Sequence, residues 1–363
     1  MDVTAIALLG LGLVLLLVGG SLLVRGASLL AQAAAVSPIV VGLTVVAFGT
    51  SAPELATSVA AALRGSGDIA FGNVVGSNIF NVLFILGASA IVAPLVVAQK
   101  LVRVDVPILI GLALAVLALG GDGRFSRPEG AGLLAALLAY VVYTVRASPR
   151  EPAAVRAEYE QAFAAREVRR AGGLAGSLGL VVVGLALLVW GSRWLVAGAV
   201  DLARAVGVSE LIIGLTIVAA GTSMPEVATS IVAAWKGERD IAVGNVLGSN
   251  VFNILGVLGA SALLAPGGVP ATAAAMRFDV PVMIAASIAC LPICLTGHRI
   301  SRWEGIVLLG YYGAYVAFLI LDAANHDRLP TFSWIMLAFV MPLTALTFAV
   351  VAARRRAGAP DAA

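Results

Sequence analysis

Apolar runs long enough to cross a bilayer, about 20 residues each, recur from one end of this chain to the other. Eleven such spans are predicted, at residues 4–24, 38–63, 69–93, 104–121, 128–146, 174–197, 210–235, 241–265, 278–296, 302–321 and 332–352. Only 12% of the residues are charged, against about 25% in soluble domains. The chain is therefore expected to be an all-α polytopic membrane protein, and soluble, disordered and nucleic-acid-binding classes are excluded. The net charge of +3 does not indicate nucleic acid, because the basic residues lie in loops between apolar spans.

An internal repeat organises these spans. Residues 42–87 align without gaps on residues 214–259, and 30 of the 46 positions are identical. The likeness continues as far as Ser126–Gly130, which matches Ser301–Gly305. Spans 1–5 are thus repeated as spans 6–10, and because five is odd, the second copy must enter the membrane inverted. Paired inverted repeats with a site at their interface are a transporter architecture.

The repeat divides the chain into four predicted parts. These are repeat 1 at residues 1–147, a cytoplasmic linker at 148–172, repeat 2 at 173–322, and an extra helix with a basic tail at 323–363. With the N-terminus outside, 16 of the 23 Lys and Arg residues fall on the cytoplasmic side, as the positive-inside rule requires. The C-terminal Arg354–Arg356 is then cytoplasmic. Because Ala is abundant and Lys is scarce, we expect the plasma membrane of a prokaryote.

Two carboxylates lie in the middle of apolar spans, at equivalent positions of the repeats. Gly49–Glu54 reads Gly-Thr-Ser-Ala-Pro-Glu, and Gly221–Glu226 reads Gly-Thr-Ser-Met-Pro-Glu. An ionisable residue inside the membrane indicates a functional site. Pseudo-symmetry predicts that Glu54 and Glu226 face each other near the midplane. There they repel unless protons or cations lie between them, and one divalent cation would balance both charges.

A proline precedes each carboxylate and predicts a break in its helix. Pro53 and Pro225 remove a helical hydrogen bond, so carbonyls of residues 47–50 and 219–222 are expected to be available as ligands. Thr50 shares a helix face with Glu54, because the two are four residues apart. The predicted ligand atoms are all oxygens, which suits hard cations such as Ca²⁺ and Na⁺.

A polar stripe follows in spans 3 and 8. A spacing of four places the members of each trio on one helix face: Asn73, Ser77 and Asn81, and their mates Asn245, Ser249 and Asn253. Ion ligation is expected of Ser77, Asn81, Ser249 and Asn253. Interhelical hydrogen bonding is expected of Asn73, Asn78, Asn245 and Asn250.

Other repeated polar residues are expected to be structural. Ser126–Glu129 and Ser301–Glu304 have the spacing of capping boxes at helix starts. Asp105 and Asp279 lie near the ends of spans 4 and 9, where we expect caps or anchors at the membrane interface.

At these motifs the chain resembles the sodium/calcium exchanger family of the calcium/cation antiporter superfamily. The two Gly-Thr-Ser-x-Pro-Glu segments, and the Gly-Ser-Asn-x-Phe-Asn segments Gly76–Asn81 and Gly248–Asn253, look like the alpha-repeats of that family. The likeness covers spans 1–10. It implies a ten-helix inverted-repeat fold and alternating access, with long spans 1 and 6 sliding against the rest. The chain departs from the pattern in adding span 11 and in having only a short linker.

The resemblance also implies the ligands. Glu54 and Glu226 are then the principal Ca²⁺ ligands, helped by backbone oxygens of Thr50 and Thr222. Sodium uses the same carboxylates together with Ala47, Ser51, Ser77, Ala219, Ser223 and Ser249, and Asn81 and Asn253 complete the site. Potassium-dependent exchangers typically carry Asp at the last position, so Asn253 favours independence from K⁺.

The leading interpretation is a Na⁺/Ca²⁺ antiporter with no cofactor and no obligatory protein partner. An exchanger of H⁺ for Ca²⁺ or another divalent cation remains an alternative, because protons could also neutralise the carboxylates. A cation channel is a different class, which an uncompensated carboxylate pair argues against because it indicates tight binding. A carboxylate-dyad enzyme would leave the symmetric polar stripes without a use, so we do not expect an enzyme.

Overall fold

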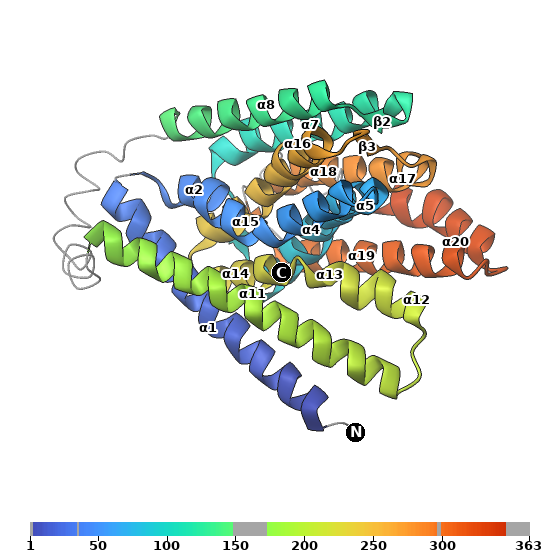
Figure 1. The fold of residues 1–363 in the computed structure, drawn as a ribbon, viewed down its shortest axis with the longest axis horizontal. Helices are drawn as coiled ribbons and strands as arrows, with labels where there is room; N and C mark the ends of the chain where they lie inside the picture. The colour runs from blue at the N-terminus through green and yellow to red at the C-terminus, as the bar shows by residue number, and fades with distance from the viewer. Residues whose placement is uncertain (1–2, 35, 148–172, 296–298, 346–363) are drawn as a thin grey trace, which may run out of the picture.

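The computed structural model describes residues 3–34, 36–147, 173–295 and 299–345 (Figure 1). The predicted linker and the basic tail lie outside the described residues. The first half contains α1 (Val3–Ala34), α2 (Pro38–Val41), η1 (Gly42–Val46), α3 (Ala47–Thr50), α4 (Ala52–Leu63), α5 (Gly67–Phe80), η2 (Asn81–Leu86), α6 (Gly87–Val92), β1 (Leu95–Val96), η3 (Leu101–Asp105), α7 (Val106–Leu119), η4 (Gly120–Asp122), β2 (Arg124–Phe125) and α8 (Arg127–Arg146).

The second half repeats this order. It contains α11 (Gly173–Ala205), α12 (Glu210–Ile213), η5 (Gly214–Val218), α13 (Ala219–Gly221), α14 (Met224–Trp235), α15 (Arg239–Phe252), η6 (Asn253–Leu258), α16 (Gly259–Leu264), β3 (Val269–Pro270), α17 (Ala273–Arg277), α18 (Asp279–Leu295), β4 (Arg299–Ile300) and α19 (Arg302–Ala323). The extra helix follows as α20 (Leu329–Ile335) and η7 (Met336–Val340). The chain is thus an all-α polytopic membrane protein of two inverted five-helix repeats with an additional C-terminal helix.

The predicted spans correspond to helices of unequal length. Within the described ranges, seven helices are long and apolar enough to cross a membrane, or eight if the bent pair Pro38–Thr50 and Ala52–Leu63 is one span. Predicted spans 7, 9 and 11 coincide with shorter pieces. These are α12 to α14, the 17-residue α18, and the apolar helix that starts at Leu329, three residues before its predicted beginning.

Two short antiparallel strand pairs join the halves, and the hydropathy pattern did not predict them. Strand β1 pairs with β4 through Leu95 and Ile300, and β2 pairs with β3 through Phe125 and Val269. In the predicted topology each pair brings together two loops of the same membrane side. Each strand therefore contacts the opposite repeat, which ties the outer helices of one half to those of the other.

The two long helices α1 and α11 lie side by side and cross one face of the molecule (Figure 1). Glycines recur every seventh residue where they meet, at Gly12, Gly19 and Gly26 in α1 and at Gly184, Gly191 and Gly198 in α11. A Cβ at Gly12 would lie 2.5 Å from the Leu195 nitrogen, and one at Gly184 would lie 2.6 Å from the Leu23 nitrogen. Only glycine permits this approach of two backbones, as at other small-residue helix contacts in membranes.

The repeated capping boxes are confirmed, because Glu129 and Glu304 each accept bonds from the backbone N–H and the hydroxyl of the preceding Ser126 or Ser301. The helix cap expected of Asp105 is not made by its side chain, and the alternative, an anchor at the membrane interface, stays a prediction. Asp105 is fully buried and caps no helix; its carboxylate accepts a hydrogen bond from Tyr140 of α8 at 3.0 Å.

The counterpart carboxylate behaves in the same way. Asp279 accepts a hydrogen bond from Tyr315 of α19 at 2.9 Å. The two aspartates therefore tie the fourth span of each half to the fifth. The hydropathy pattern could not show this, because it does not report which helices become neighbours.

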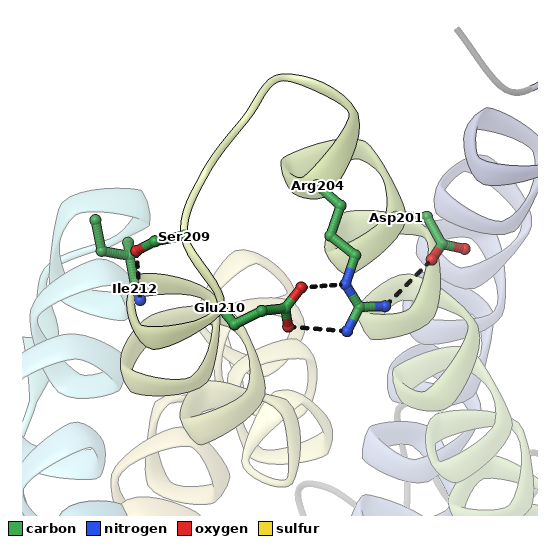
Figure 2. Close-up of polar contacts among 5 residues, drawn as sticks. All are labelled: Asp201, Arg204, Ser209, Glu210 and Ile212. Atoms are coloured by element: carbon green, nitrogen blue, oxygen red, sulfur yellow. Dashed lines mark hydrogen bonds and ion pairs between the residues drawn. The ribbon is translucent and has the colours of Figure 1, made fainter.

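An exposed ion pair fixes the turn between α11 and α12. Figure 2 shows Arg204 facing Glu210, with Nε 2.6 Å from Oε1 and Nη2 2.9 Å from Oε2. Asp201 lies 3.9 Å from the same guanidinium, and Gly207 supplies the left-handed residue of the turn with φ +84°. Exposed pairs of this kind contribute only about 0–1 kcal/mol, so this one orients the turn more than it stabilises the fold.

Candidate ion-binding site

The predicted helix breaks lie where the Gly-Thr-Ser-x-Pro-Glu motifs end. Helix α3 stops at Thr50 and α4 starts at Ala52, and the segment Pro38–Thr50 is bent by 45° relative to α4. The second half has the same break between α13 and α14. Each break places its carboxylate in the first turn of the following helix, where the helix dipole favours negative charge. Both glutamates are only 1% exposed.

Each carboxylate is held by a serine of the opposite half. The hydroxyl of Ser51 donates to Oε1 of Glu226 at 2.9 Å, and the hydroxyl of Ser223 donates to Oε1 of Glu54 at 2.9 Å. This crossed pairing brings the two carboxylates to one site, as pseudo-symmetry predicted. Ser77 joins it through a 3.3 Å bond from Ser223.

Several buried oxygens at the site have no hydrogen-bond partner among the described residues. They are Oε2 of Glu54, Oε2 of Glu226, Oδ1 of Asn81, Oγ of Ser249 and Oδ1 of Asn253. Leaving a buried polar atom without a partner is costly. These five atoms are all oxygens, which is the ligand type that a hard cation prefers.

Two asparagines brace the breaks from the opposite half. Thr50 donates to Oδ1 of Asn245 at 3.1 Å, and the amide nitrogen of Asn245 donates to Ser230 of α14 at 2.9 Å. The equivalent chain runs from Thr222 to Asn73 at 3.4 Å, and from Asn73 to Ser58 of α4 at 2.9 Å. The interhelical role predicted for Asn73 and Asn245 is confirmed.

Of the other two asparagines predicted to bond between helices, only Asn250 does so through its side chain. Asn81 donates to Oδ1 of Asn250 across the two halves at 2.9 Å, as an interhelical role for Asn250 requires. The side chain of Asn78 instead donates to the carbonyl of Val74 in its own helix at 2.7 Å. Its predicted interhelical side-chain bond is wrong, because the carbonyl four residues earlier is the nearer acceptor.

The carbonyls before the breaks are less free than the prolines suggested. The Ala47 carbonyl accepts a bond from the Ser51 N–H at 3.0 Å, and the Gly221 carbonyl accepts one from Ser192 of α11 at 2.6 Å. A carbonyl oxygen has two lone pairs. At Ala47 the second one accepts a hydrogen bond from the Thr50 hydroxyl at 3.4 Å, so a cation bound there would replace that bond. Sequence reasoning also missed the π-helical turns η1, η2, η5 and η6, which flank the site in both halves and are typical of functional positions.

The two halves differ in how tightly they close over the site. Val46 is fully buried, whereas its counterpart Val218 is 51% exposed. A Cβ at Gly248 would lie 2.6 Å from the Leu43 carbonyl oxygen, but a Cβ at Gly76, the counterpart of Gly248, would have nothing within 4 Å. The first-half segment η1–α3 is thus packed against α15, and the second-half segment η5–α13 is more open.

The same difference extends to the predicted ligands. Ala47 and Thr50 are fully buried, whereas Ala219 is exposed and Thr222 is half-buried. The other predicted ligands are buried, namely Ser51, Ser77, Asn81, Ser223, Ser249 and Asn253. The second-half side of the site, called the open side below, is therefore less covered by protein than the first-half side, called the sealed side.

Comparison with known proteins assigns the chain to a family. The model of the sodium/calcium exchanger protein family matches residues 4–146 and 176–321, which include both breaks and both polar stripes. The chain belongs to the sodium/calcium exchanger family. The chain is therefore a cation antiporter.

Individual relatives agree with this assignment. Sodium/calcium exchanger MaX1 of Methanosarcina acetivorans is 34% identical over 341 residues, covering 86% of this chain and 96% of that protein. Inner membrane protein YrbG of Escherichia coli is 36% identical over 319 residues, covering 87% of this chain and 96% of that protein. A structure of the sodium-calcium exchanger NCX_Mj matches with a TM-score of 0.75 and 31% identity, over 87% of this chain and 99% of that one.

Proposed function

We propose that this exchanger moves Na⁺ against Ca²⁺ by alternating access, at a midplane site that contains Glu54 and Glu226. The observation that carries the proposal is the pair of buried carboxylates, each with one oxygen bonded to a serine of the other half and one oxygen without a described partner. Two uncompensated charges in a buried site are strongly unfavourable, and a divalent cation between them removes the penalty.

The surrounding oxygens support sodium as the counter-ion. The proposed Ca²⁺ ligands are Glu54, Glu226 and the backbone oxygens of Thr50 and Thr222. The proposed Na⁺ ligands are the same carboxylates with Ala47, Ser51, Ser77, Ala219, Ser223 and Ser249, completed by Asn81 and Asn253. Since both ions need the carboxylates, one Ca²⁺ and a full set of Na⁺ ions exclude each other, which is the condition for exchange.

The unequal closure of the two halves supports alternating access. Val46 is buried and Val218 is half exposed, although the two residues occupy equivalent positions of the repeated sequence. With the predicted topology, the open side faces outward and the sealed side faces the cytoplasm of a prokaryotic cell. If the first-half segment takes the open packing of the second-half segment, and the second-half segment takes the closed one, the site opens to the cytoplasm. A sealed side also argues against a continuous channel.

The test is Ca²⁺ uptake into proteoliposomes loaded with Na⁺ and diluted into Na⁺-free buffer. We expect uptake to require the outward Na⁺ gradient and to disappear in Glu54→Gln and in Glu226→Gln. Asp122→Asn is the matched control, because Asp122 lies in an exposed turn away from the site. Uptake driven by a proton gradient but not by Na⁺, in folded protein, would replace the sodium proposal with H⁺/Ca²⁺ exchange.

A further inference from the structure

A second cavity lies beside the ion site, within the membrane-spanning part of the molecule. It has a volume of about 760 Å³, and its walls come from η1, α3, α8, α11 and α15. Pockets of about 300–1,000 Å³ hold drug-sized ligands. The wall is apolar almost throughout, with Phe48, Leu137, Leu185 and Trp190 as its large members.

The two hydroxyl groups in this wall are already hydrogen-bonded. Thr44 donates to the Val40 carbonyl at 2.6 Å, and Tyr140 donates to Asp105 at 3.0 Å. Water in a buried site needs two to four polar partners, and this wall offers it little. The cavity is therefore suited to hydrocarbon.

The cavity is continuous with the bilayer-facing surface. Phe48 is 57% exposed and Trp190 is 56% exposed. Trp190 shares α11 with the exposed Val182, Val183 and Trp194, so large apolar side chains border the cavity mouth, as on a lipid-facing surface. The cavity is therefore expected to open to the acyl chains of the bilayer.

The repeat explains why the space exists in this half. Across the pseudo-symmetry, Leu137 corresponds to Tyr312 and Gly256 corresponds to Phe84. In the other half the ring of Phe84 stacks on Phe80 with centroids 4.7 Å apart and meets Tyr312 at 5.4 Å. In this half the space beside Gly256 is taken by the ring of Phe252, which would lie 2.8 Å from a Cβ there. Leu137 is the cavity residue that is smaller than its counterpart, and it leaves the volume of the Tyr312 ring unfilled.

We propose that this cavity binds one acyl chain of a phospholipid from the surrounding bilayer. The chain enters past Phe48 and Trp190 and lies against Gly49 and Ala52, which flank the broken segment next to Thr50 and Ser51. It thus contacts the outer side of the helix break whose inner side faces the ion site. The proposal does not depend on which cations are exchanged.

The test uses the full chain in liposomes that contain a phospholipid with a photoactivatable diazirine on one acyl tail. After irradiation, peptide mass spectrometry should find adducts on cavity residues of α8 and α11, such as Val141 and Val189. Leu137→Tyr installs the residue of the other half, and Ala186→Phe fills the cavity from the opposite wall. Both substitutions should abolish these adducts. Leu138→Tyr is the control, because Leu138 is 69% exposed on the same helix, and it should retain them.

Three results would overturn the proposal. One is labelling of Val141 and Val189 that persists in both filling variants, which would indicate surface contact only. Another is wild-type protein labelled at Leu138 but not in the cavity. The third is cavity labelling by a diazirine fatty acid in the absence of any labelling by the phospholipid, which would identify a free fatty acid as the ligand. The two filling variants probe opposite walls, so failure of one to fold leaves the other as the test.

Discussion

The unequal packing of Gly76 and Gly248 predicts that one methyl group can shift the balance between two access states. A Cβ at Gly248 would lie 2.6 Å from the Leu43 carbonyl oxygen, whereas a Cβ at Gly76 would have nothing within 4 Å. When the two halves exchange packing, Gly76 comes against the carbonyl of residue 215, the counterpart of Leu43. Gly76→Ala should therefore strain only the opposite state, and Gly248→Ala should strain only the state described here.

The size of the effect follows from the contact. The distance must widen from 2.6 Å to at least 3.4 Å before it is an ordinary van der Waals contact. Overpacking of this kind costs about 1–3 kcal/mol, which changes a two-state equilibrium about 5–150-fold. The gain in helix propensity from Gly to Ala is present in both states and cancels.

Val218 provides the reporter for this equilibrium, because it is 51% exposed while its counterpart Val46 is fully buried. Cys290 and Cys294 are first replaced by Ser, and Val218→Cys is then labelled with a membrane-impermeant maleimide from the open side. The rate of labelling measures the fraction of molecules in the open state.

Gly76→Ala should speed labelling of the Val218→Cys reporter and Gly248→Ala should slow it, and both should reduce ion exchange. Gly111→Ala is the control, because a Cβ at Gly111 of α7 would also meet nothing within 4 Å. Equal labelling rates in all variants, or slower labelling in Gly76→Ala, would refute the symmetric-exchange reasoning.

Three further substitutions test other parts of the structure. Asn245→Ala should raise the Ca²⁺ concentration for half-maximal uptake by about 5–150-fold. The reason is that the hydrogen bond from Thr50 to Asn245 holds a predicted ligand segment, and its loss costs about 1–3 kcal/mol. Unchanged affinity would show that this bond is dispensable. Tyr140→Phe should lower thermal stability without changing that concentration, because Asp105 loses its bond at 3.0 Å away from the site and a buried unpaired acceptor costs about 1–3 kcal/mol; a melting temperature equal to wild type would contradict this. Asn253→Asp adds a carboxylate to the site and should raise divalent affinity and permit K⁺ stimulation of uptake, and the absence of both effects would place residue 253 outside the ion site.

The sequence was sufficient to predict much of the site, because the same motif occurs once in each repeat. Glu54 and Glu226 are ionisable residues in apolar spans, and their positions 172 residues apart identify them as symmetry mates. The breaks before them follow from the missing N–H of proline. The crossed partners were not predictable, because sequence spacing cannot show that Ser51 bonds to Glu226 rather than to its own neighbour Glu54.

The access state was not predictable either. Val46 and Val218 lie in nearly identical segments, yet one is buried and the other is half exposed. A difference between two copies of the same sequence is a property of the conformation. The strand pairs and the Asp105–Tyr140 bond also depend on which elements become neighbours, and hydropathy does not report this.

The crossed contacts bear on how such a molecule can be assembled. The bond from Ser51 to Glu226 and the bond from Ser223 to Glu54 are symmetry mates of each other, and so are the two strand pairs. These are the contacts of an isologous interface, in which one surface recognises a second copy of itself. Two separate copies of a single five-helix unit, inserted in opposite orientations, would satisfy these contacts without a covalent connection. Neither copy alone would hold a carboxylate together with its serine. The ion site would therefore form only when the two copies pair.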